Sequence, residues 1–308
     1  MPGTFISLVL IIKLYVIGSN HYTRIATEIR DRTTLVKPRI VAFLEHLPLL
    51  ISRLWRGIAT VSLFGLFGLI SLLLSLIALP LLFLFIRDST QRRSAGRLAV
   101  SGACWLFIRA MSLMGVLRYT INGRETVTSS KGLLIVANHP TLIDGLFLLS
   151  VFRNSTCVVK QQIFAHRITR FVVNFIGYLS NNDPVEVITQ SIAILREGGN
   201  LIFFPEGTRS TVGKPLDFSR GAATIAIRSH ATVVPIAIRC SPPTLHKSSP
   251  WYAVPQTRVR FEVNILDTID VADFVKNAEN ERSASVALNN HLLSSITKTT
   301  KGGLRENT

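Results

Sequence analysis

The chain has 308 residues, of which 48% are hydrophobic and 17% are charged, and its mean hydropathy is +0.37. A typical soluble domain carries about 25% charged residues, so the composition indicates contact with a membrane. Lysine and arginine outnumber aspartate and glutamate by 34 to 18, and the resulting charge of +16 favours a polyanionic partner. The sequence contains no recognition helix, paired zinc ligands or aromatic RNA-binding motif, which favours lipid headgroups over nucleic acid.

Residues 1–56 form a basic N-terminal arm with a helical pattern. Its first apolar run, Phe5 to Ile17, is not followed by a cleavage site of small residues, so we do not expect a cleaved signal peptide. The rest of the arm is interpreted either as an amphipathic surface helix or as a solvated, partly disordered segment. Breaks are expected at Pro38 and Pro48.

An uncharged segment, Gly57 to Ile86, follows the arm and has basic residues on both sides. As a helix it would be about 45 Å long, against about 30 Å for the hydrocarbon core of a bilayer. One tilted span is therefore possible, and Pro80 also permits a re-entrant hairpin within one leaflet. The basic flanks give no orientation and slightly favour the hairpin. We assign residues 57–116 to a membrane-associated helical segment.

Short apolar runs alternate with amphipathic stretches over residues 117–295, which predicts an α/β domain. The expected fold is a mixed sheet covered by helices on both faces, with an N-terminal membrane-anchoring helical segment. Strands are expected at 132–137, 155–159, 201–204, 233–238 and 258–263, and helices at 142–152, 161–176, 184–196 and 219–228. Residues 296–308 are polar and are expected to form a flexible tail.

His139 and Asp144 stand at the end of the first of these strands. A spacing of five residues places two side chains about 140° apart on a regular helix, so they could meet only across a turn. Pro140 favours such a turn because it cannot occupy a helix interior. A carboxylate on one imidazole nitrogen would fix the tautomer and leave the other nitrogen as a general base.

A second motif, Phe-Pro-Glu-Gly-Thr-Arg-Ser over residues 204–210, follows the strand at 201–204. Glu206 can accept hydrogen bonds from hydroxyls, and Gly207 permits a backbone conformation that other residues avoid. Thr208 can donate a hydrogen bond, and Arg209 offers a fork of donors suited to phosphate or carboxylate. The two motifs together therefore predict a ligand site at the carboxyl ends of two strands.

The cysteines Cys104, Cys157 and Cys240 lie far apart, without the close pairs of metal or redox sites, and are interpreted as buried apolar residues. No metal and no cofactor is expected.

The Asn-His-x4-Asp and Phe-Pro-Glu-Gly-Thr-Arg-Ser motifs resemble those of the 1-acylglycerol-3-phosphate and lysophospholipid acyltransferases. The resemblance covers roughly 132–238 and includes the Val-Pro-containing strand at 233–238. It implies that His139 is the catalytic base, that Asp144 supports it, and that Glu206, Gly207, Thr208 and Arg209 hold the acceptor. It also implies an acyl thioester as co-substrate, either acyl-CoA or acyl carrier protein, and an active site that faces the cytosol.

One position departs from the family pattern. Where the family has an arginine that helps to bind the acceptor phosphate, alignment on Gly177 places Asp183. A carboxylate there would repel phosphate. Lys160 or Arg167 could substitute for the arginine, or the acceptor could be a lysolipid without phosphate, such as an acylated amino-acid lipid.

The sequence thus predicts a membrane-bound O-acyltransferase of phospholipid biosynthesis, with a lysolipid acceptor, an acyl-CoA or acyl carrier protein donor, the inner or cytoplasmic membrane as its location and no nucleic-acid partner. The favoured acceptor is 1-acylglycerol-3-phosphate. No Gly-x-Ser-x-Gly nucleophile motif is present, which favours direct transfer without an acyl-enzyme. A thioester or lipid hydrolase and a non-enzymatic membrane binder remain as alternatives.

Overall fold

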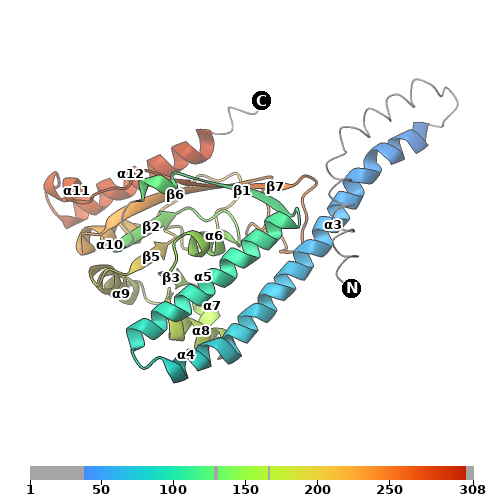
Figure 1. Ribbon diagram of the computed structural model, residues 1–308. Coiled ribbons are helices and arrows are strands. Elements are labelled where there is room, and N and C mark those ends of the chain that lie inside the picture. The colour runs from blue at the N-terminus through green and yellow to red at the C-terminus, as the bar shows by residue number, and fades with distance from the viewer. Residues whose placement is uncertain (1–37, 128–130, 166, 303–308) are drawn as a thin grey trace.

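A computed structural model of the protein describes residues 38–127, 131–165 and 167–302. It contains a mixed sheet with helices on both faces and a long N-terminal helical hairpin (Figure 1). The sheet strands are β1 (Leu117–Asn122), β2 (Leu133–Ala137), β3 (Ser155–Val159), β4 (Leu179–Ser180), β5 (Asn200–Phe203), β6 (Thr232–Ser241) and β7 (Val259–Ile265). The helices that follow β1 are η2 (Arg124–Thr126), α6 (Asp144–Val151), α7 (Gln161–Ala165), α8 (Arg167–Ile176), α9 (Pro184–Arg196), α10 (Gly221–Ser229), α11 (Ala272–Lys276) and α12 (Glu281–Gly302). The predicted mixed α/β fold is confirmed.

The strand order in the sheet is β1-β7-β6-β2-β5-β3-β4. All neighbouring strands are parallel except β6 and β7. The two strands that precede the sequence motifs, β2 and β5, are direct neighbours, with Val136 opposite Phe203. Because their carboxyl ends lie at the same edge, the residues after both strands meet there.

Both faces of the sheet are covered, and β2 shows this directly. Leu133 and Ile135 belong to a core with α3, α5 and α6, whereas Leu134 and Val136 belong to a second core with α9, α10 and α12. All five residues of the strand are buried. A continuous apolar run, rather than an alternating one, is what burial on both faces requires.

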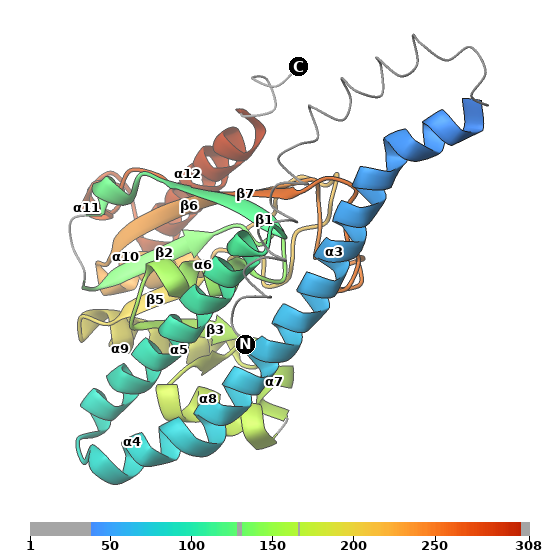
Figure 2. The same ribbon diagram turned by 45° about the vertical axis from the view of Figure 1, so that its right-hand side comes forward.

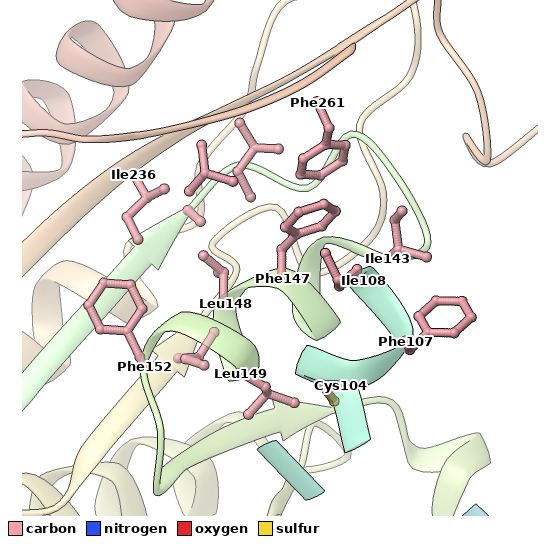
Figure 3. Packing of buried hydrophobic residues seen from close by; sticks show 14 of the residues in the cluster. Cys104, Phe107, Ile108, Ile143, Phe147, Leu148, Leu149, Phe152, Ile236 and Phe261 are labelled. Carbon is pink, nitrogen blue, oxygen red and sulfur yellow. The ribbon is translucent and has the colours of Figure 1, made fainter. Parts of the chain in front are cut away.

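Helix α6 is fixed on the sheet by aromatic packing (Figure 3). The ring of Phe147 stacks on that of Phe261 in β7, with 3.9 Å between centroids and 6° between planes. Leu148, one residue further along α6, is also fully buried in this core. Since Asp144 is the first residue of α6, this packing sets the position of its carboxylate.

The N-terminal helices form an antiparallel hairpin beside the sheet (Figures 1 and 2). Helix α3 (Pro38–Leu73), the π-turn η1 (Leu74–Ala78) and α4 (Leu79–Phe85) are continuous, and α5 (Ser89–Leu113) returns along α3. The expected break at Pro48 is wrong, because α3 continues through it. Chain reversal occurs after Phe85, so the apolar segment does not itself contain a re-entrant turn. The expectations for residues 1–37 lie outside the described residues.

Helix α5 also belongs to the core of the α/β domain. Its residues Cys104, Phe107 and Ile108 are buried in the same cluster as β2 and α6. The boundary expected at residue 117 therefore falls inside one continuous hydrophobic core.

The expected flexible tail is wrong for residues 296–302. Helix α12 continues to Gly302, and Ile296 is fully buried in the second core. The helix presents Leu288 and Leu292 on the same buried side as Ile296. A spacing of four residues places these side chains on one face of the helix. This apolar face packs on the sheet although most of the residues of α12 are polar. Residues 303–308 lie outside the described residues.

Candidate active site

His139 and Asp144 meet across the turn between β2 and α6, as their spacing predicts. His139 Nδ1 lies 2.7 Å from Asp144 Oδ2. The Asp144 side chain is fully buried, whereas the His139 side chain is 20% exposed. The carboxylate is therefore behind the imidazole, and the ring is open to a ligand on its other side.

Asp144 is held by Thr141 as well as by His139. The backbone amide of Thr141 donates to Asp144 Oδ2 at 2.7 Å, and the Thr141 hydroxyl donates to Oδ1. Burial raises the pKa of the Asp144 carboxyl, and the hydrogen bonds from His139 and Thr141 oppose that shift. No role for Thr141 follows from the sequence alone, although it lies inside the motif.

Two residues of the second motif hold His139 from other directions. The ring of Phe204 stacks on the imidazole, with 4.3 Å between centroids and 25° between planes. Glu206 Oε1 accepts a hydrogen bond from the backbone amide of His139 at 2.8 Å and another from Ser210 Oγ at 2.9 Å. The two motifs are therefore one structural unit, which also contains a bond from the Ser210 amide to the His139 carbonyl.

Glu206 was expected to hold the acceptor, but its Oε1 is directed at the main chain of His139. Burial raises the pKa of this carboxyl, and hydrogen bonds from His139 and Ser210 oppose the shift. Gly207 has φ of +65°, the left-handed conformation that its motif position was expected to require. Thr208 is half-buried in the same turn.

Arg209 binds the loop after β6. Its Nη1 donates to the carbonyl oxygens of Leu245 and His246, at 2.9 and 3.2 Å. These bonds fix the guanidinium, and Arg209 together with His139 lines one cavity. The structure thus brings His139 and Arg209 to the same cavity.

The cavity has a volume of about 700 Å³. It is lined by β3, by the end of β5, by the loops after β2, β4 and β5, and by residues of α7, α9 and α10. Most of the lining is apolar, including Leu142, Val159, Ile188 and Phe203. A cavity of this size with few polar groups suits a ligand that is part hydrocarbon.

Two cationic side chains, Lys160 and Arg209, line the cavity, and no carboxylate is among its lining residues. Lys160, at the end of β3, lines it together with Arg209, whereas Arg167 does not. Asp183, the residue that departs from the family pattern, is not among the lining residues. Its carboxylate instead caps α9 by accepting bonds from the amides of Val185 and Glu186.

Cys157 also lines the cavity, but burial raises the pKa of its thiol to about 12. A thiol is a weak nucleophile unless it ionises. The expectation that the cysteines are buried is confirmed for Cys104 and Cys157, and Cys240 is half-buried.

Residues 118–239 match a protein-family model described as Acyltransferase. This range contains both motifs. A chloroplastic 1-acyl-sn-glycerol-3-phosphate acyltransferase of Arabidopsis thaliana is 31% identical over 135 residues, which are 42% of this chain and 38% of that protein. A 1-acyl-sn-glycerol-3-phosphate acyltransferase of Pseudomonas aeruginosa is 27% identical over 169 residues, 51% of this chain and 63% of that protein. The chain thus spans less than two thirds of the length of these relatives.

The fold is similar to a solved structure, that of the 1-acyl-sn-glycerophosphate acyltransferase PlsC of Thermotoga maritima. The TM-score is 0.61 at 20% sequence identity, and the match covers 82% of this chain and 99% of the other. The similarity extends beyond the region of the family model and supports the overall architecture.

Proposed function

We propose that this chain moves a fatty acyl group from an acyl thioester to the free hydroxyl of a lysolipid. The match of residues 118–239 to the Acyltransferase family model and the similarity to 1-acyl-sn-glycerol-3-phosphate acyltransferases support the proposal. The observation that carries the proposal is the 2.7 Å contact between His139 and the buried Asp144, at the wall of a cavity that also holds Arg209.

The proposed reaction needs one base. With Nδ1 of His139 donating to Asp144, the unprotonated Nε2 accepts the proton of the acceptor hydroxyl. The hydroxyl oxygen forms a bond to the thioester carbonyl carbon, the carbon–sulfur bond breaks, and the thiolate takes the proton from the imidazolium. A thioester is already activated, so positioning and this proton transfer suffice. The protonated thiol of Cys157 gives no support to an acyl-enzyme.

The proposed acceptor is 1-acylglycerol-3-phosphate. Lys160 and Arg209 supply positive charge to the cavity, and the capping role of Asp183 keeps its carboxylate out of the lining. The apolar remainder of the wall would contact acyl chains. The sequence suggested an acceptor without phosphate because the Asp183 carboxylate was expected to repel phosphate. Since that carboxylate does not line the cavity, we favour the acceptor with phosphate. The donor is proposed to be acyl-CoA or acyl carrier protein.

The proposed location is a membrane surface. Among the described residues, one apolar helix, Leu47–Phe85, is long enough to cross a bilayer by length and composition. It also contacts other parts of the chain at two places: Arg56 donates to the carbonyls of Gln256 and Thr257, and Leu79 is fully buried. At these two positions the helix faces protein.

The same helix exposes large apolar residues over most of its length, among them Ile58, Leu76, Leu84 and Phe85. An exposed apolar surface of this length is typical of a membrane contact. We therefore favour a helix that lies in one leaflet, with the cavity facing the cytosol.

The test is an assay of the purified protein with acyl-CoA or acyl carrier protein and a panel of lysolipids, with products identified by mass spectrometry. His139→Ala should abolish transfer, and His291→Ala, which changes an exposed histidine of α12, should not. Thioester loss that is independent of any lysolipid would instead indicate a hydrolase. Full transfer by His139→Ala would exclude the proposed base.

A further inference from the structure

A second cavity, of about 490 Å³, lies between the turn of the helical hairpin and α8. Its lining includes Arg92 and Arg93 from α5, Arg167 and Arg170 from α8, and the rings of Phe83 and Phe171. We call these six residues the arginine site. It shares no lining residue with the cavity of His139, so it is a separate feature.

The arginine site carries positive charge without local compensation. Between Gly57 and Val116 the sequence contains one acidic residue, Asp88, and between Gly145 and Asn182 it contains none. The Asp88 carboxylate accepts a bond from the Gln91 amide as the cap of α5. None of the ion pairs among the described residues includes an arginine of the site. Four arginines that line one hollow favour an anion with several oxygens.

The hydrophobic part of the site lies at the turn of the hairpin. The guanidinium of Arg92 stands 4.4 Å above the ring of Phe83. Leu84 and Phe85, which follow on α4, are 70% and 77% exposed. Phe171 on the facing helix is also exposed. Arginines beside exposed aromatic and aliphatic groups match the boundary between headgroups and acyl chains of a bilayer.

We propose that the arginine site binds the phosphate headgroup of an anionic phospholipid in the membrane on which the protein sits. The inference rests on the proposed membrane placement, because the apolar turn must enter the acyl layer for the arginines to reach the headgroups. The adjacent Leu84 and Phe85 favour a lipid over a soluble phosphate compound, which would leave these side chains in water.

The experiment measures binding of the full chain to vesicles of neutral phosphatidylcholine and to vesicles with added phosphatidylglycerol. The test variant is Arg167→Gln with Arg170→Gln, because both side chains are exposed and make no hydrogen bond within the described residues. The matched control is Lys276→Gln with Arg282→Gln, which removes two exposed charges from α11 and α12. Thermal unfolding establishes that both variants are folded.

The test variant should lose about tenfold to 30-fold in affinity for the anionic vesicles and keep its affinity for neutral ones. The control should lose much less. Restoring the charges with Arg167→Lys and Arg170→Lys should recover most of the binding.

Equal losses by the test and control variants would overturn the proposal in favour of diffuse surface charge. The proposal would also be overturned if the test variant lost affinity for soluble coenzyme A and kept its affinity for the anionic vesicles. If the unaltered chain bound neither kind of vesicle, the membrane placement itself would be wrong, which separates that failure from failure of the site.

Discussion

The carboxylate of Glu206 and the backbone amide of His139 are joined by a hydrogen bond of 2.8 Å, although 67 residues separate them in the sequence. The bond exists because β2 and β5 are neighbours and end at the same edge of the sheet. Glu206 thus holds the main chain of the proposed base, whereas Arg209 faces the cavity. The contribution of Glu206 to catalysis would be to position His139.

Replacement of Glu206 tests that positioning role. Glu206→Gln keeps an oxygen for both donors and should retain most of kcat. Glu206→Ala leaves the His139 amide and the Ser210 hydroxyl without this acceptor, at about 1–3 kcal/mol of folding free energy, and should lower kcat by about 10–100-fold. Steady-state kinetics and urea unfolding measure the two effects. A rise in KM for the lysolipid at constant kcat in both variants would show instead that Glu206 binds the acceptor.

The raised pKa of Glu206 predicts a pH effect on stability. Because its folded pKa lies above its unfolded value, the folded state holds the proton more tightly than the unfolded state. This contribution stabilises the fold at low pH and is lost as the pH rises from the ordinary glutamate range through the folded pKa. Glu206→Gln cannot titrate, so the free energy of unfolding of the unaltered chain should fall relative to that of the variant over this window. Chemical unfolding at several pH values measures the difference, and a constant difference would contradict it.

Asp144→Asn should reduce kcat by about 10²–10⁴-fold, because an amide nitrogen facing His139 or Thr141 disrupts the tautomer and the network of donors. Vesicle binding should be unchanged. Asp267→Asn, at an exposed carboxylate, is the matched control. Wild-type turnover by Asp144→Asn would show that the carboxylate is not needed to orient the base.

Replacement of Asn138, the first residue of the Asn-His-x4-Asp motif, is expected to lower the stability of the fold. Its side chain is 3% exposed and exchanges two hydrogen bonds with the backbone of Ile238 in β6, at 2.7 and 2.9 Å. Asn138→Ala leaves both backbone groups buried without these partners and should lower the free energy of unfolding by about 2–4 kcal/mol. Asn122→Ala, which removes an exposed amide contact, should cost much less. Urea unfolding compares the two, and equal values would refute the assigned role.

Ile296 tests whether the C-terminal helix is part of the core. The side chain is fully buried, so Ile296→Ala should lower the free energy of unfolding by about 2–5 kcal/mol. Lys298→Ala, two residues away at an exposed position, should change it by less than about 0.5 kcal/mol. Chemical unfolding followed by circular dichroism is sufficient. A negligible effect of Ile296→Ala would mean that α12 is detached in solution.

The central strands and their helices could be predicted because their signals are local. Helix α9 has the predicted bounds, since Asp183 caps it and Pro184 occupies its first position. Strand β1 was missed because it is half-polar and pairs with β7, more than 130 residues later. Helix α12 was missed because Ser285 and Asn289 lie on its buried side, where burial depends on the partner rather than on an apolar pattern.

In the site, the contact between His139 and Asp144 could be predicted because it depends on a single turn, which Pro140 and the spacing of five residues indicate in the sequence. The contacts of Glu206 and Phe204 with His139 were not predicted. They depend on which strands are neighbours, and the order of strands in a sheet is not encoded in any single segment. The capping role of Asp183 is local and agrees with the helix start expected at Pro184. That its carboxylate does not line the cavity was not predicted, because the lining depends on the tertiary fold.

The adjacency of β2 and β5 has a consequence for how such a protein could diversify. The groups proposed for chemistry are anchored at the ends of these two strands, whereas much of the cavity wall comes from the chain between them, over β3, α7 and the start of α9. Substitution, insertion or deletion in that intervening stretch could change the shape of the cavity and leave the relative positions of His139 and Asp144 unchanged. Selectivity and reactivity are therefore separable in this architecture.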